Sequence, residues 1–221
     1  MDTKVPVISI VFIEDYQLIR SAVSSYMNTI SDIKIVAQAE NAEDGLRFVA
    51  EHKPDIVLMD LGLPKMNGIE ATRKIKESNP DVKVIILTSQ ENDESVIAAL
   101  GAGANAYCLK NIPTDKLVEV IRNVMDGAAW LDPKIASVAL AVFSKADSKH
   151  EVNNDISLGV REREVLRLLT LGKNNNEIAE MLYVSVHTVK SQVSTLLQKL
   201  SVSDRVQAAV KAVTQGLVSL D

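Results

Sequence analysis

The 221-residue chain has one cysteine, Cys108, and three histidines, His52, His150 and His187, that lie far apart in the sequence. A single cysteine cannot form an internal disulfide, and scattered histidines lack the spacing of a metal-ligand motif. No apolar run approaches the ~20 residues that a membrane-spanning helix needs. We therefore expect a cytoplasmic protein without structural zinc, neither secreted nor embedded in a membrane.

The chain also lacks an excess of basic residues. Its net charge is −5. Residues 149–221 carry 9 basic and 8 acidic side chains, whereas residues 1–148 carry 15 basic and 21 acidic side chains. Obligate nucleic-acid binders usually show a marked basic excess. Any contact with nucleic acid must therefore depend on one small face.

Residues 5–127 show the alternation of strands and helices that is typical of a parallel sheet with crossover helices. Expected strands span 7–13, 33–38, 55–59, 82–87 and 105–109, and expected helices span 17–29, 42–51, 68–77, 94–102 and 114–126. Because the strands are continuous runs of Val, Ile and Leu, we expect both faces of the sheet to be buried by helices. This pattern predicts a doubly wound α/β domain.

The remaining chain has a different character. Residues 128–157 contain a short apolar helix near 135–143 and then a polar stretch, which together indicate a linker. Residues 158–221 contain no strand pattern and four helical stretches, expected at 161–171, 175–182, 186–200 and 204–215. We therefore predict a small all-α domain of four helices.

Polar residues follow the expected strands at the edge where open α/β sheets carry their functional sites. Glu14 and Asp15 follow the first strand, Asp60 the third, Thr88 the fourth and Lys110 the fifth. Three carboxylates at one edge repel each other unless a cation lies among them, and oxygen ligands suit Mg²⁺. Singly, each acid could cap a helix and Lys110 could be a solvated loop residue. As a set, they indicate phosphoryl transfer onto a carboxylate, with Asp60 as the nucleophile.

The same positions resemble the receiver domain of two-component response regulators over about the first 126 residues. The matching residues are Glu14-Asp15, Asp60-Leu61-Gly62-Leu63-Pro64, Met66-Asn67-Gly68, Thr88, Tyr107 and Lys110. The resemblance implies a flavodoxin-like (βα)5 fold in which Asp60 is the phospho-acceptor, assisted by Thr88 and Lys110. It further implies that Asp15, Asp60 and the carbonyl of Gly62 bind Mg²⁺, that Glu14 supports the metal through water, and that Thr88 and Tyr107 form a switch pair.

The second domain contains a helix-turn-helix pattern. Asn174 and Glu177 form a plausible capping box, and Ser185 is placed to cap the next helix. Val189, Val193, Leu196, Leu197 and Leu200 of that helix form one apolar stripe at helical spacing. By itself this arrangement also fits a helical hairpin that only packs or dimerises.

The pattern is similar to the LuxR-type helix-turn-helix of NarL/FixJ response regulators, through Arg161 to Leu166, Glu177-Ile178-Ala179, Thr188-Val189-Lys190 and Lys199-Leu200. The resemblance implies that the helix after Ser185 enters the major groove, with Lys190, Ser191 and Ser194 reaching bases or phosphates and Thr188 near the DNA backbone. Gly159 stands where the family usually has threonine as the cap of the first helix, a change of small cost because glycine caps acceptably. Gln192 and Asn176 stand where the family often has histidine and lysine, so the DNA face has less positive charge and weak binding by a monomer is expected. The last helix, with Val206, Ala209, Val210 and Val213, would be the dimer surface or would cover its own core.

These features predict a DNA-binding transcriptional regulator whose receiver is phosphorylated at Asp60 by a partner histidine kinase. The predicted partners are double-stranded DNA and a second copy in a homodimer, with no membrane and no catalysis beyond the receiver's own phosphorylation and dephosphorylation. One alternative is a phosphohydrolase, although the loops after the strands are short for a substrate pocket. Another is the same DNA-binding protein with a receiver that serves as a phosphate-independent docking module.

Overall fold

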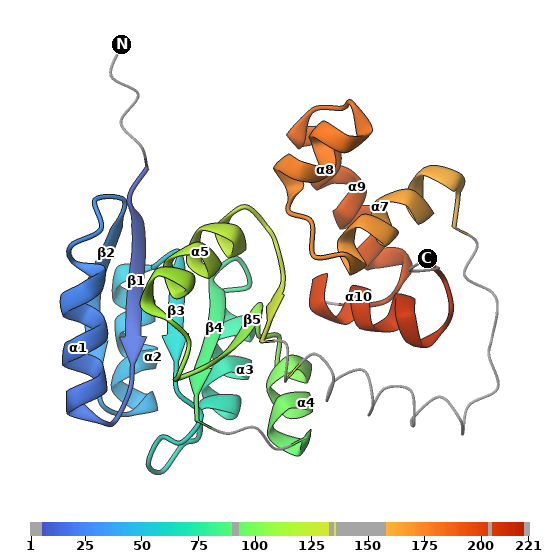
Figure 1. Ribbon diagram of the computed structural model, residues 1–221. Helices are drawn as coiled ribbons and strands as arrows, with labels where there is room; N and C mark the ends of the chain where they lie inside the picture. The colour runs from blue at the N-terminus through green and yellow to red at the C-terminus, as the bar shows by residue number, and fades with distance from the viewer. Residues whose placement is uncertain (1–5, 90–92, 133–134, 136–157, 203–204, 219–221) are drawn as a thin grey trace. The chain divides into compact units, whose positions relative to one another are not determined.

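The computed structural model describes residues 6–89, 93–132, 135, 158–202 and 205–218 (Figure 1). The chain divides into two compact units, residues 1–125 and residues 126–221. The predicted linker helix near 135–143 lies outside the described residues apart from Ile135. No described helix has both the length and the apolar composition needed to cross a bilayer.

The first unit is built around a sheet. Its strands are β1 (Ile8–Ile13), β2 (Ile33–Ala39), β3 (Ile56–Met59), β4 (Lys83–Thr88) and β5 (Ala106–Leu109). A two-residue strand that was not predicted, β6 (Trp130–Leu131), lies beyond residue 125. The order of these five strands in the sheet is β2-β1-β3-β4-β5, and every pairing among them is parallel. The predicted strands therefore form one parallel sheet, with ends that differ from expectation by a residue or so.

Helices cover both faces of this sheet, as predicted. They are α1 (Gln17–Met27), α2 (Ala42–His52), α3 (Gly68–Ser78), α4 (Asp93–Gly101) and α5 (Thr114–Met125). Helix α1 contacts α5 on one face, while α2 contacts α3 and α3 contacts α4 on the other (Figure 1). The doubly wound, flavodoxin-like arrangement is thus confirmed.

Burial is complete in the central strands but not at the edge. All residues of β3 and β5 are buried, as is β4 after Lys83. In β2 only the first and last residues are buried. The prediction that every strand is buried on both faces is therefore wrong for β2, because this strand lies at the edge of the sheet and has a neighbouring strand on one side only.

The register aligns the carboxyl ends of the strands. Ile13, the last residue of β1, pairs with Met59, the last residue of β3. Thr88, which ends β4, pairs with Leu109, which ends β5. Residues that directly follow these strands are consequently brought to one edge of the sheet, although they are up to about a hundred positions apart in sequence.

The second unit contains the four predicted helices, α7 (Val160–Thr170), α8 (Asn175–Leu182), α9 (Val186–Lys199) and α10 (Arg205–Thr214). Its core includes Val165, Leu169 and Ile178. The predicted stripe of α9 faces this core: Val189, Leu196 and Leu200 are buried, and Val193 and Leu197 are partly buried against them. The apolar stripe therefore fixes which face of α9 remains outside.

Both predicted caps in this unit are present. Asn174 Oδ1 accepts from the Glu177 amide at 2.9 Å, and Glu177 Oε2 accepts from the Asn174 amide at 2.8 Å. Ser185 Oγ accepts from the Thr188 amide at 3.0 Å. Each bond satisfies a backbone donor that the first turn of a helix leaves without a helical partner.

Arg205 was not predicted to have a role, yet it is one of the few buried charged residues described. Its guanidinium donates to the carbonyl oxygens of Gly127 and Lys173, and also to Asn175 Oδ1. Burial lowers the pKa of Arg205 to about 10, so the side chain still carries its charge at neutral pH. Arg205 thereby ties the start of α10 to the turn between α7 and α8.

Replacing Gly68 with alanine should destabilise the first unit. An added Cβ would lie 2.0 Å from the Asp60 carbonyl oxygen and 2.9 Å from Leu61 Cα, and neither backbone atom can move alone. We expect Gly68→Ala to lower the free energy of unfolding by about 1 to 3 kcal/mol in urea titrations. Gly101→Ala is the matched control, because nothing lies within 4 Å of its added Cβ. Equal stability of the two variants would contradict the close packing of Gly68 against the backbone of Asp60 and Leu61.

Candidate functional site

Three carboxylates gather at the carboxyl edge of the sheet. Glu14 and Asp15 directly follow β1, and Asp60 directly follows β3. One carboxylate oxygen from each lies within 4.8 Å of the other two. Glu14 and Asp60 are buried, whereas Asp15 is exposed. The parallel register thus brings together the acidic residues that the sequence analysis selected.

Lys110 lies among these acids. Its Nζ is 2.9 Å from Glu14 Oε1 and 3.2 Å from Asp60 Oδ2. The backbone amide of Lys110 donates to the Thr88 carbonyl at 2.9 Å, which continues the pairing of β4 with β5. Burial alone would lower the pKa of Lys110, but the hydrogen bond to Glu14 and the attraction of Asp60 together raise it. The ammonium group therefore stays charged.

Glu14 is not fully compensated by this lysine. Burial raises the pKa of Glu14 above its ordinary value, although the hydrogen bond and charge of Lys110 lower it in part. Its second oxygen, Oε2, is buried and has no hydrogen-bond partner among the described residues. A buried carboxylate oxygen without a partner, next to two further carboxylates, fits a hard divalent cation such as Mg²⁺.

The other predicted site residues lie around this cluster. Thr88 is the last residue of β4 and is 1% exposed, while Tyr107 in β5 is fully buried. Gly62 is exposed in the loop after Asp60, between the buried side chains of Leu61 and Leu63. These two leucines anchor the loop that carries Asp60.

One residue near the cluster was missed from the sequence. Arg20 in α1 donates from Nη1 to the carbonyl oxygens of Glu14 at 2.5 Å and Asp15 at 3.3 Å. Its Nη2 lies 3.9 Å from Glu40 Oε2, in the residue directly after β2. The sequence did contain a signal for this contact, because Arg20 lies in the first turn of the helix that directly follows the acidic residues Glu14 and Asp15.

The predicted DNA-contacting residues lie along α9. Lys190, Ser191 and Ser194 are exposed, as expected for the face opposite the apolar stripe. Thr188 is half-buried, and its hydroxyl lies 2.8 Å from Ser185 Oγ. The polar face of α9 is thus accessible, and the Ser185 cap holds the first turn of the helix.

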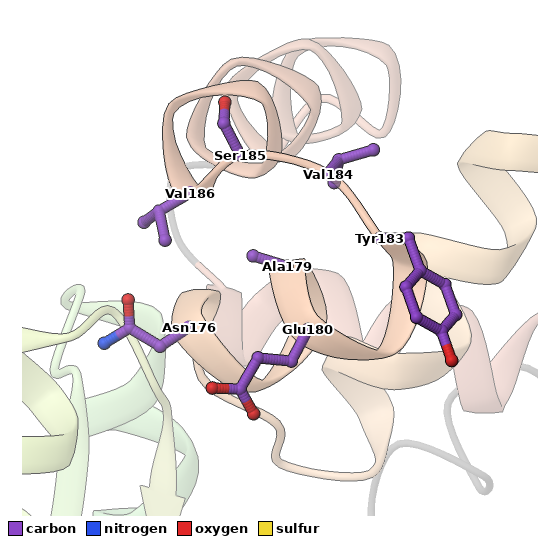
Figure 2. Close-up of a pocket in the computed structure, with 7 residues that line it drawn as sticks. All are labelled: Asn176, Ala179, Glu180, Tyr183, Val184, Ser185 and Val186. Atoms are coloured by element: carbon purple, nitrogen blue, oxygen red, sulfur yellow. The ribbon is translucent and has the colours of Figure 1, made fainter.

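An open groove of about 610 Å³ lies beside this helix (Figure 2). Its lining comes from α8 and from the turn into α9: Asn176, Ala179, Glu180, Tyr183, Val184, Ser185 and Val186. The one charged residue in this lining is Glu180. A negative charge disfavours a DNA phosphate, so we do not assign the groove to the DNA-contacting face.

Replacing Glu14 with glutamine should stabilise the metal-free protein at neutral pH. The raised pKa of Glu14 means that its ionisation opposes folding, a cost that grows as the pH rises from about 4.5 through the folded value. At pH 7 we expect Glu14→Gln to unfold at a higher urea concentration than wild type. At pH 4 the difference should shrink. A Glu14→Gln protein that is less stable than wild type at pH 7 would rule out this account.

Comparisons with known proteins match both units. A family model described as response regulator receiver domain matches residues 10–122, and one described as bacterial regulatory proteins, luxR family, matches residues 156–212. The transcriptional regulatory protein DegU of Brevibacillus brevis is 36% identical over 226 residues, with 96% of each chain covered. The response regulator protein VraR of Staphylococcus epidermidis is 34% identical, covering 96% of this chain and 99% of the relative.

Among solved structures, the response regulator ChrA of a heme-sensing two-component system is 28% identical. It has a TM-score of 0.53 and covers 96% of this chain and 99% of its own. The two family matches place the receiver domain before the luxR-family domain, and the relatives are matched over nearly the whole of both chains. The chain therefore belongs to the NarL/FixJ type of two-component response regulators, with a receiver domain followed by a LuxR-type DNA-binding domain.

Proposed function

We propose that Asp60 accepts a phosphoryl group from a partner histidine kinase and that α9 contacts double-stranded DNA. The observation that carries the first part is the position of Lys110 Nζ between Glu14 and Asp60, next to the unpartnered Glu14 Oε2. This arrangement offers a nucleophile, a fixed cation and free carboxylate oxygens in one place.

In the proposed reaction, an Asp60 carboxylate oxygen attacks phosphorus, a new P–O bond forms and the bond to the kinase histidine nitrogen breaks. Lys110 then pairs with a phosphoryl oxygen, which it can do by releasing part of its contact with Asp60. Asp15, Asp60, the carbonyl of Gly62 and, through water, Glu14 would hold Mg²⁺. When bound, this ion neutralises the charge that develops on the phosphoryl oxygens.

The buried positions of Thr88 and Tyr107 support their proposed role as a switch pair. Thr88 ends β4, so its hydroxyl is at the same strand edge as Lys110. Tyr107 is fully buried in the neighbouring strand, and in the proposed switch a change in the position of Thr88 would alter its packing. The proposed readout is a change of shape on the face formed by α4, β5 and α5.

Homodimerisation through α10 is also proposed. Ala208 and Ala212 of this helix are buried in the core of their own unit, while Ala209 is half-buried. The side chains of Val206, Val210 and Val213, which complete the predicted dimer stripe, lie outside the described side chains. Among the described side chains of α10, Ala208 and Ala212 thus face the core, and Ala209 is available for a partner.

Phosphorylation should depend on Asp60. We expect acetyl phosphate with Mg²⁺ to add one hydroxylamine-labile phosphoryl group to wild type and none to Asp60→Asn, measured by intact-protein mass spectrometry. Asp81→Asn is the matched control, because Asp81 is exposed in the loop before β4. Phosphorylation of Asp60→Asn at the wild-type rate would exclude Asp60 as the acceptor.

DNA binding should depend on Lys190. We expect Lys190→Ala to weaken binding by ~1 to 3 kcal/mol if the side chain contacts a base, and by less if it touches only phosphate. The duplex would be one selected by the wild-type protein from a random pool, with affinity measured by fluorescence anisotropy over a salt series. The variant should fold, because Lys190 is exposed.

Lys199→Ala is the matched control for this experiment. It removes the same charge from the same helix, but Lys199 Nζ lies 2.6 Å from Glu162 Oε1 and is already paired within the protein. We expect this control to bind DNA within about twofold of wild type. Wild-type affinity of Lys190→Ala at every salt concentration would mean that this face of α9 does not read DNA.

A further inference from the structure

Arg20 joins the ends of two strands at the acidic cluster. Strand β1 ends at Ile13, and the Glu14 amide makes the last bond to β2, at 3.0 Å from the Ala39 carbonyl. Beyond this point the carbonyl oxygens of Glu14 and Asp15 turn to the guanidinium of Arg20, at 2.5 and 3.3 Å. The Arg20 side chain is only 16% exposed, so these bonds are largely shielded from water.

The Asp15 carboxylate has little else to orient it. Its side chain is exposed, and no hydrogen bond or ion pair within the described part of the chain holds its carboxylate oxygens. The backbone of residues 14 and 15 therefore sets the direction of the Asp15 Cα–Cβ bond, and with it the positions that the carboxylate can reach. Arg20 is the side chain that holds this backbone after the strand pairing has ended.

We propose that Arg20 is a positioning residue for the metal site: it fixes the Glu14–Asp15 backbone so that both carboxylates face one divalent cation. This inference rests on the proposed function, because it assumes that the acidic cluster binds Mg²⁺. Residues that orient metal ligands through hydrogen bonds typically affect metal affinity by 10- to 100-fold.

The chemistry of the side chain explains why arginine suits this position. The guanidinium is a planar fork with several donors, so it reaches two carbonyl oxygens and the carboxylate of Glu40 at once. A lysine keeps the positive charge but presents a single nitrogen. Geometry and charge can therefore be separated by comparing Arg20→Lys with Arg20→Gln.

The test is a calorimetric titration of the full-length, unphosphorylated protein with MgCl2, a readout that does not depend on phosphorylation. We expect Arg20→Gln to raise the dissociation constant for Mg²⁺ roughly 10-fold, the lower end of the range for such residues. Arg20→Lys should fall between this variant and wild type. In acetyl phosphate assays, the Mg²⁺ concentration for half-maximal rate should rise while the limiting rate is retained.

Arg122→Gln is the matched control. It breaks the ion pair between Arg122 Nη2 and Asp32 Oδ1, which are 2.7 Å apart. Asp32 directly precedes β2, whereas Glu40, the partner of Arg20, directly follows it. This variant should lose stability in urea titrations but keep the wild-type affinity for Mg²⁺. A purely structural role for Arg20 predicts the same result for Arg20→Gln as for this control.

The outcomes separate the two proposals. Wild-type affinity for Mg²⁺ in a folded Arg20→Gln protein, with Asp60 phosphorylation intact, overturns the positioning role alone. Full restoration of affinity by Arg20→Lys also overturns it, because charge would then be sufficient. If wild type itself binds no Mg²⁺ and is not phosphorylated on Asp60, both the positioning role and the proposed receiver function fail.

Discussion

The ammonium group of Lys110 allows two carboxylates to be buried at one edge of the sheet. Without it, Glu14 and Asp60 would repel each other in a place where water cannot screen them. The lysine offsets this repulsion only in part, since the pKa of Glu14 is still raised. The negative charge that Lys110 leaves uncompensated is the charge that the proposed Mg²⁺ would neutralise.

Two arginines act on the backbone where regular structure ends. Arg20 binds the carbonyl oxygens just after β1, and Arg205 binds carbonyl oxygens at the turn between α7 and α8. Both are well shielded from water. A guanidinium satisfies several acceptors at once, so it can fix an irregular segment that no ladder or helix holds. In each unit such a segment borders a proposed functional element.

Helix α9 illustrates how packing determines a binding face. Its five-residue apolar stripe covers the core of the second unit, which leaves Lys190, Ser191 and Ser194 outside. The face carries modest positive charge, so if it contacts DNA as proposed, its contribution to affinity should depend on the position of its side chains more than on overall attraction.

The sequence by itself determined the element order, both caps of the helix-turn-helix and the identity of the acidic cluster, because these depend on local spacing and on residues that directly follow strands. It did not determine that β2 is a half-exposed edge strand, since strand order depends on pairings between distant segments. The contacts of Arg20 with Glu40 and of Arg205 with Gly127 and Lys173 were likewise decided by the tertiary structure. Long side chains reach partners that chain spacing alone does not identify, and only the packed fold selects among them.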